Sequence, residues 1–367
     1  MGQRVCSTAL SAVTGCRRIG CGVLGVRLLR CVALRISLSA KSKLVSAILA
    51  FVGLALTTAL VIYFGAGEVL HALTSVNIYD LIKYFIVQLV ILAGLGLCWR
   101  ILLRSHQKGS YLLCLWGRAV RDATGEFLPF SQLGGLVLGA RVMTLGGVAK
   151  TDATASTLAD LTTEFLAQLL FVGIGLIILA RQVPHSDLLM PISIGLAVAV
   201  LLGGGLIIAQ VGMGTKLFNA LALRIADTTG SGAIDNMQRL QVALNGLYAQ
   251  HHRLAWASFC HLICWFGTGT ASYVGFHAFG VPLSWVDAMC IEALLHAIMA
   301  LAFFIPGRVG VQEAAYALIG SLFGIPPDIS ISLSFLRRAR DFVIAVPVLL
   351  AWQGLEARHL KLNINTR

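Results

Sequence analysis

Apolar residues gather in long stretches along this chain, and short polar or basic stretches separate them. A helix needs roughly 20 predominantly apolar residues to cross the hydrocarbon core of a bilayer. The region between the fourth and fifth of these stretches, 212–253, is more polar and predicts amphipathic surface helices with a Gly/Ser break at 230–232. Stretches of sufficient length predict membrane spans at about 44–64, 81–103, 155–180, 188–211, 254–279 and 329–353.

Two further apolar stretches, 112–150 and 286–324, are interrupted near their middles by FLPFSQLGG (127–135) and FIPGRVGVQE (304–313). Proline followed by glycine usually ends a helix, and in lipid the freed backbone groups must be satisfied by protein or by enclosed water. Both stretches therefore predict re-entrant hairpins, and the fold class is an all-α integral membrane protein with about six transmembrane helices and two such hairpins. The residues expected at the hairpin breaks are Pro129, Gly134, Gly135, Pro306, Gly307 and Gly310.

Basic residues are concentrated at the start of the chain. Residues 1–43 hold eight basic residues and no acidic one, which predicts a poorly ordered leader rather than a folded domain. The transmembrane domain is expected at 44–355 and a basic tail at 356–367. Short loops rich in Lys and Arg stay in the cytoplasm, and this rule applied to the predicted span order places both termini there.

The two interrupted stretches can be superimposed with an offset of 177 residues. Pro129 then falls on Pro306, and Glu164 falls on Asp341. Each half, about 112–180 and 286–353, reads as a broken hairpin followed by a span that contains a carboxylate. The predicted topology brings the hairpins in from opposite sides, which predicts an inverted repeat of the kind found in transporters. The alternative is chance similarity between two Pro/Gly-interrupted segments.

Composition agrees with a membrane protein, because 57% of the 367 residues are apolar, 12% are charged and the mean hydropathy is +0.85. The leader supplies most of the net charge of +12, so a nucleic-acid partner is not expected.

The spacing Cys260-His261-x-x-Cys264 raises a metal hypothesis, but tetrahedral zinc needs four ligands and no second pair lies nearby. We expect these cysteines to be small buried hydrophobes, and no metal or cofactor is predicted.

Four charges fall within five positions of the last predicted span: Arg337, Arg338, Arg340 and Asp341. Each uncompensated charge at the centre of a membrane helix costs about 2.5–3.5 kcal/mol on insertion scales, so these side chains must pair, line water or lie near the interface. Arg337 and Asp341 are four residues apart and can form a pair on one helix face. The alternative is a cluster at the membrane interface, with the helix beginning after it.

Glu313 and Gln312 begin the helix that follows the second break. A carboxylate in a first helical turn is stabilised by the helix dipole, so Glu313 could be only a cap, or it could pair with Arg338 or Arg340. A guanidinium fork also suits a lipid phosphate. The candidate substrate-binding or translocation residues are Glu313, Gln312, Arg308, Arg337, Arg338, Arg340, Asp341, Glu164, Asp160 and Arg121.

Two segments of the chain carry a family resemblance. They read WGRAVRDATGEFLPFSQLGG (116–135) and AFFIPGRVGVQEAAYALIGSLFGIPPDISISLSFLRRARDFVIAVPVLLAWQ (302–353). The second resembles the C-terminal signature of hopanoid-biosynthesis-associated flippase-like membrane proteins, within the superfamily of the lysylphosphatidylglycerol synthase transmembrane (flippase) region. The first resembles that family's other signature. The resemblance covers roughly 45–355 and implies a flippase-like fold in a bacterial inner membrane.

The sequence departs from the family pattern at Leu136, where the first signature usually has an acidic residue after Q-x-G-G. In the predicted repeat Leu136 aligns with Glu313, so one of two matched carboxylates is absent here. The family also usually has Glu and Asn where Asp122 and Gly125 stand.

No hydrolase or transferase motif occurs in the sequence, which favours transport over catalysis. The resemblance implies movement of a lipid between leaflets, and a hopanoid or an anionic phospholipid is the expected cargo. The alternative is an integral membrane enzyme, or an enzyme partner or scaffold, in hopanoid biosynthesis. Expected partners are membrane lipids and hopanoid-synthesis proteins.

Overall fold

Helix is the regular secondary structure throughout the described part of this computed structural model, which comprises residues 74, 76–103, 110–127, 131–208, 231–302, 305 and 308–365. The leader 1–43, the first predicted span at 44–64, and Pro129, Pro306 and Gly307 lie outside these residues. The described helices are α4 (Ile78–Leu102), α5 (Tyr111–Phe127), α6 (Ser131–Leu145), α7 (Lys150–Gln182), α8 (Leu189–Ile208), α10 (Ser231–Tyr248), α11 (His251–Ala278), α12 (Trp285–Leu301), α13 (Val311–Leu322) and α14 (Pro327–Asn365).

Two described helices, α4 and α7, are long and apolar enough to cross a membrane. A shorter apolar stretch at 189–205 lies in α8. The helices α4, α7, α8, α11 and α14 cover the second to sixth predicted spans, and α10 lies in the polar stretch where surface helices were predicted. The structure therefore agrees with an all-helical membrane protein. Of the described helices, α4 and α7 meet the length and hydropathy expected of a membrane span.

Each interrupted stretch forms two packed helices. The first pair is α5 with α6, and the second is α12 with α13. Gly310 has a φ of 82°, a backbone conformation that residues with a side chain rarely adopt. Helix α13 begins directly after it. Gly134 and Gly135, in contrast, lie inside α6 and not at the break. Gly135 serves close packing instead, because a Cβ there would lie 2.5 Å from the carbonyl oxygen of Arg121 on α5.

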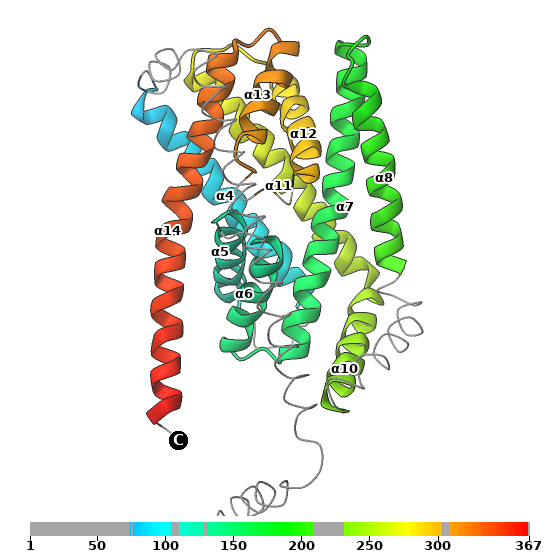
Figure 1. Cartoon of the computed structure of the whole chain (residues 1–367), viewed down its shortest axis with the longest axis vertical. Helices are drawn as coiled ribbons and strands as arrows, with labels where there is room; N and C mark the ends of the chain where they lie inside the picture. Colours follow the sequence, from blue (N-terminus) through cyan, green and yellow to red (C-terminus); the bar gives the residue numbers. More distant parts are fainter. Residues whose placement is uncertain are drawn as a thin grey trace, which may run out of the picture. The chain divides into compact units, whose positions relative to one another are not determined.

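The two halves pack reciprocally within residues 50–367. The helix after each hairpin contacts the first helix of the other hairpin, so α7 packs on α12 and α14 packs on α5. The helices that precede the hairpins, α4 and α11, pack on each other. Figure 1 shows α7 and α14 running in opposite directions, and α4 and α11 likewise. A core of buried apolar side chains from α4, α7, α11, α12, α13 and α14 joins the halves.

Small residues let these helices approach closely. A Cβ on Gly175 of α7 would lie 2.4 Å from the Cβ of Ala293 on α12. Helices in lipid associate through such close packing because the surrounding acyl chains are as apolar as the helix surface. The contact between the halves is therefore specified by residue size.

The last helix, α14, begins at Pro327 and continues to Asn365, with Pro347 inside it. The helix therefore starts ten residues before Arg337, which rules out the alternative that it begins after the charged cluster. It also extends past the predicted span end at 353, so described residues of the tail are helical. Arg337, Arg338 and Arg340 therefore lie in the first half of α14, where their side chains reach neighbouring helices.

Candidate functional site

A cavity of about 350 Å³ lies among seven helices, α4, α5, α7, α11, α12, α13 and α14. Apolar side chains such as Leu92, Phe165 and Met299 form part of its wall. Charged side chains form another part, and these are Arg118, Arg121, Asp122, Glu126, Glu164, Arg308, Arg337, Arg340 and Asp341. Most of these charges belong to two buried networks, one in each half of the chain.

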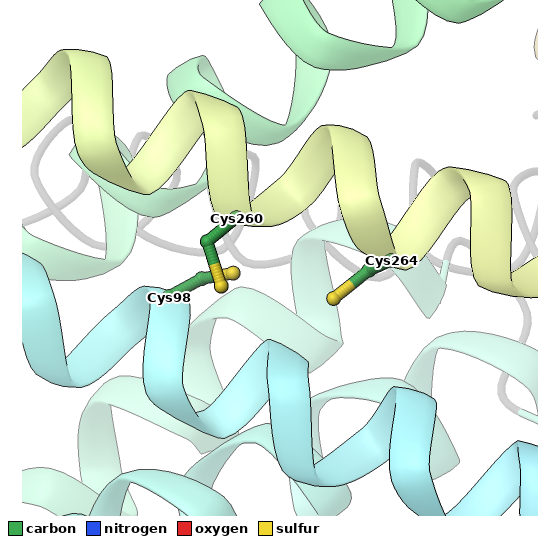
Figure 2. Close-up of side chains that lie close together, drawn as sticks. All are labelled: Cys98, Cys260 and Cys264. Carbon is green, nitrogen blue, oxygen red and sulfur yellow. The ribbon is translucent and has the colours of Figure 1, made fainter.

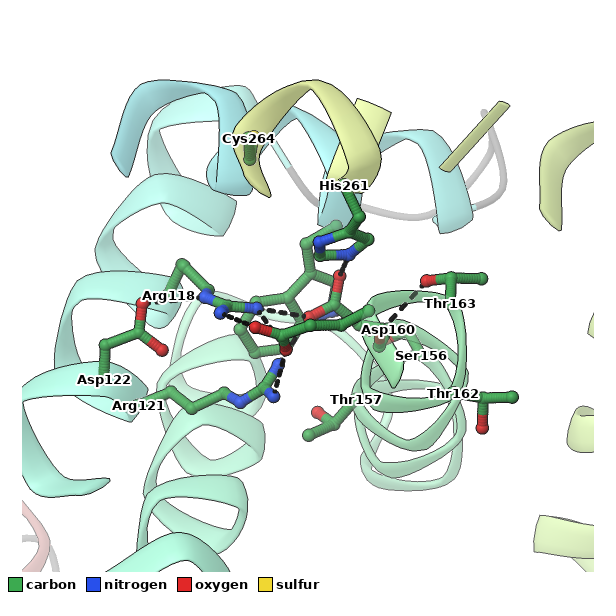
Figure 3. Close-up of polar contacts among 12 residues, drawn as sticks. Arg118, Arg121, Asp122, Ser156, Thr157, Asp160, Thr162, Thr163, His261 and Cys264 are labelled. Carbon is green, nitrogen blue, oxygen red and sulfur yellow. Dashed lines mark hydrogen bonds and ion pairs between the residues drawn. The ribbon is translucent and has the colours of Figure 1, made fainter. Parts of the chain in front are cut away.

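The first network, here the Asp160 network, joins α5, α7 and α11 (Figure 3). Asp160 Oδ2 accepts from Arg118 Nη1 at 3.0 Å and from Arg121 Nη1 at 2.5 Å. Its other oxygen, Oδ1, lies 3.1 Å from Nε2 of His261. Glu164, one turn along α7, receives both arginines as well, at 2.5 Å from Arg118 Nη2 and 2.7 Å from Arg121 Nη2. Two arginines are thus clamped by two carboxylates.

Helical spacing explains how the Asp160 network forms. Arg118, Arg121 and Asp122 occupy positions i, i+3 and i+4 on α5, and Asp160 and Glu164 occupy i and i+4 on α7, so each set shares a helix face. Asp160 is fully buried. A buried charge without its partner destabilises a protein by about 3–5 kcal/mol, so these pairs must form together for α5 to dock on α7.

The second network, here the Glu292 network, joins α11, α12, α13 and α14. Glu292 is fully buried and forms an ion pair with Arg337. Ser272 donates to Glu292 Oε2 at 2.5 Å, and the Tyr316 hydroxyl donates to the same oxygen at 3.0 Å. His296 Nε2 lies 3.1 Å from Glu292 Oε1. Arg337 therefore pairs across to α12, and not with Asp341 on its own helix as the spacing suggested, because the fully buried Glu292 needs a permanent positive charge and Asp341 has Arg340 beside it.

Glu313 forms a separate pair with Arg338. The Arg338 Nε and Nη2 atoms donate to Glu313 at 2.5 and 3.1 Å. The Gly310 amide donates to Glu313 at 2.8 Å, so the carboxylate is both a helix cap and an ion-pair partner. Neither Glu313 nor Arg338 lines the cavity. This pair fixes the end of the second hairpin to α14.

The remaining predicted residues lie on the cavity wall. Gln312 donates to the Ser334 hydroxyl at 2.8 Å, and Arg340 lies 3.2 Å from Asp341. Arg308, which has a φ of 49°, lies 3.6 Å from Glu126 on α5. Its pair has the longest separation of the cavity's ion pairs, and both of its side chains are partly exposed.

The predicted offset of 177 residues relates the networks with their charges reversed. Arg337 aligns with Asp160, and each pairs with the opposite charge on the first helix of its own hairpin, Glu292 and Arg118 respectively. In the predicted repeat, the same offset also bears on Leu136. It places Leu136 on Glu313 and Leu161 on Arg338, so the first half lacks both members of that ion pair rather than one.

The networks also contain residues that were not among the predicted site residues: Arg118, His261, Ser272, Glu292, His296 and Tyr316. Glu292 had a readable signal, because a carboxylate inside the apolar run CIEALLHAIM must find a partner, with His296 one turn away. The sequence around Arg118 does not distinguish it from the basic residues expected in a loop at the membrane edge. Which cation meets which carboxylate depended on helix packing.

Three thiols meet where α4 crosses α11 (Figure 2). The sulfur atoms of Cys98, Cys260 and Cys264 lie within 4.8 Å of one another. His261, from the same sequence motif, faces Asp160 instead. Three thiols without His261 are one ligand short of a closed structural zinc site.

The helical fold, the apolar spans and the buried charges around one amphipathic cavity define a polytopic membrane protein with an internal polar site. Residues 50–348 match the family described as the lysylphosphatidylglycerol synthase TM region, and the chain belongs to that family. No curated protein sequence matches it significantly. The family supports a membrane location and a lipid-related function.

Proposed function

We propose that this protein moves a lipid between the leaflets of a bacterial inner membrane, as a flippase-like transporter of a hopanoid or an anionic phospholipid. Its termini are cytoplasmic, and its six spans and two re-entrant hairpins form an inverted repeat. The cavity between the hairpins holds the lipid head group while the chain alternates its access from one side to the other.

The observation that carries this proposal is the make-up of the cavity wall. Arg118, Arg337 and Arg340 face the same space as Leu92 and Phe165. A lipid is itself polar at one end and apolar along the rest, so a wall of both kinds can accommodate the head group and the start of its chains. A purely structural ion-pair cluster would not require a cavity.

The reciprocal packing of the halves supports alternating access. Transporters with inverted repeats place their substrate site where discontinuous helices meet, and one half moves against the other around that site. Here α7 on α12 and α14 on α5 are equivalent contacts, and both border the cavity. Rocking about α4 and α11 would exchange which hairpin closes the site.

A pair of neighbouring substitutions on α14 tests the proposal. Ala345 is buried and lines the cavity, whereas Val346 is exposed on the outer side of the helix. In proteoliposomes with fluorescently labelled phosphatidylglycerol, Ala345→Trp should abolish leaflet exchange because the indole fills the cavity. Val346→Trp should exchange lipid at the wild-type rate.

Equal exchange by Ala345→Trp and Val346→Trp would contradict transport through this cavity. If wild-type protein exchanges no lipid, and a deletion strain makes altered hopanoids, the protein serves hopanoid synthesis as an enzyme or enzyme partner instead.

A further inference from the structure

One nitrogen atom in the Glu292 network has two partners that it cannot satisfy at once. His296 Nε2 lies 3.1 Å from Glu292 Oε1 and 3.3 Å from Arg337 Nη2. A guanidinium nitrogen only donates, and a carboxylate oxygen only accepts. If Nε2 carries a proton it donates to Glu292 and opposes Arg337, and if it carries none it accepts from Arg337 and opposes Glu292. Each protonation state therefore favours a different arrangement of the three groups.

Histidine is the side chain whose charge changes most readily near neutral pH. With neutral imidazole the trio of Glu292, His296 and Arg337 has no net charge. Uptake of one proton makes His296 an imidazolium that donates to Glu292, and the trio then carries one positive charge. The buried carboxylate is shared between two cations in that state, which weakens its hold on Arg337.

Charge around the cavity gives this proton a use. Five arginines line it, and they are Arg118, Arg121, Arg308, Arg337 and Arg340. Six carboxylates among the described residues line it or pair with these arginines, and they are Asp122, Glu126, Asp160, Glu164, Glu292 and Asp341. The two sets sum to one net negative charge, which repels an anionic head group, and one added proton brings the sum to zero and removes that repulsion.

The helices packed against α12 are α7, α8, α11 and α13, and α14 reaches it through Arg337. The α8 helix contributes no titratable side chain within Leu189–Ile208. The indole of Trp265 lies 4.5 Å from the imidazole, ring centre to ring centre, and also donates to the backbone carbonyl of Glu164 at 3.4 Å. Arg337 on α14 lies beside the imidazole, and Arg308 before α13 is the other described arginine close enough to act on it. Gln168 on α7 donates to the backbone carbonyl of His296, while Ser272 on α11 and Tyr316 on α13 hydrogen-bond to its partner Glu292.

We propose that His296, held on Glu292 beside Arg337, carries one proton with each anionic lipid, so that transport is proton symport. This inference rests on the proposed function and adds its energy source. The proton enters from the side to which the cavity is open, a phosphate head group joins it, and both leave on the other side. One proton and one monoanionic lipid carry no net charge, so the cycle is electroneutral.

His261 offers an internal contrast. Its Nε2 has Asp160 as hydrogen-bonding partner, and its Nδ1 has none among the described residues. The neutral tautomer with a proton on Nε2 donates to Asp160, and no guanidinium of the described residues hydrogen-bonds to the same nitrogen. We therefore assign the transported proton to His296, although both imidazoles border the cavity.

Proteoliposomes with a pH difference across the membrane provide the test, with labelled phosphatidylglycerol as the probe. One-to-one symport gives a steady-state leaflet ratio that changes about tenfold per pH unit, because tenfold in concentration equals one unit of proton gradient. Lipid should accumulate in the leaflet facing the more alkaline side. A potassium diffusion potential of either sign should leave that ratio unchanged.

His296→Gln keeps a side chain that can donate and accept but cannot take up a proton, so it should lose the pH-driven asymmetry. His277→Gln, at the exposed end of α11, should retain it. Wild-type protein that exchanges lipid equally with and without the gradient would overturn proton symport while leaving transport intact. Asymmetry that persists in folded His296→Gln protein would overturn the assignment to His296. Wild-type protein that moves no lipid under any condition would contradict the proposed function itself.

Discussion

The pair formed by Glu313 and Arg338 allows a quantitative test of how the second hairpin is held. Glu313 is fully buried, and Arg338 is one-fifth exposed. Replacing Arg338 with leucine leaves Glu313 as an unpaired buried charge, which should destabilise the protein by about 3–5 kcal/mol. Replacing Glu313 with leucine also removes the acceptor of the Gly310 amide, which adds about 1–3 kcal/mol to the cost of the unpaired arginine.

The double variant Glu313→Leu, Arg338→Leu should behave differently. It removes both charges and recreates the leucines that the first half carries at the aligned positions, Leu136 and Leu161. Replacing a whole buried ion pair with apolar residues is often neutral or stabilising, although the Gly310 amide still loses its acceptor, so the double variant should lie within about 3 kcal/mol of wild type. The single losses sum to at least about 7 kcal/mol, so the coupling energy between the two positions should be at least about 4 kcal/mol.

Thermal unfolding of the purified protein in detergent measures these differences. A single variant should lower the Tm by on the order of 10 °C, because about 1 kcal/mol corresponds to a few degrees in a domain of this size. Glu313→Gln separates the two contributions, since the amide oxygen can still accept from Gly310. Additive losses in the double variant would refute the reasoning, because additivity means that the two side chains do not stabilise each other.

Three further predictions follow from other contacts. Asp160→Ala should lower stability by about 3–5 kcal/mol in the same unfolding assay, because two arginines lose a fully buried partner. Arg308→Ala should change stability by less than about 1 kcal/mol, since its pair with Glu126 is long and partly exposed, yet it should reduce lipid exchange in proteoliposomes. Gly175→Ala should destabilise the contact of α7 with α12, and adding Ala293→Gly should restore much of the lost Tm.

The structure also changes the role expected for Glu313. From sequence, its carboxylate beside an arginine cluster suggested contact with a head group. In the fold, Glu313 and Arg338 are not among the residues that line the cavity, whereas Arg337 and Arg340 are. Adjacent positions on a helix point about 100° apart. Arg338 therefore pairs with Glu313, while Arg337 and Arg340 line the cavity.

The sequence by itself determined the helices and the class of protein. Long apolar stretches predict helices of nearly the observed bounds, as 81–103 does for Ile78–Leu102, because a segment in lipid must satisfy its backbone hydrogen bonds internally. The interrupted stretches likewise predicted two helix pairs, since proline and glycine act on the local backbone. These properties depend on neighbours in the chain, which a sequence displays directly.

Only the tertiary structure decided which charges meet. Asp160 pairs with arginines about 40 residues earlier, and Glu292 pairs with Arg337 on the last helix, while the neighbouring Asp341 takes Arg340. Helical spacing limits the candidates to a face but cannot say which face of another helix lies opposite. That choice follows from close approaches such as Gly175 on Ala293, and the cavity between the charged faces exists only once all the helices are packed.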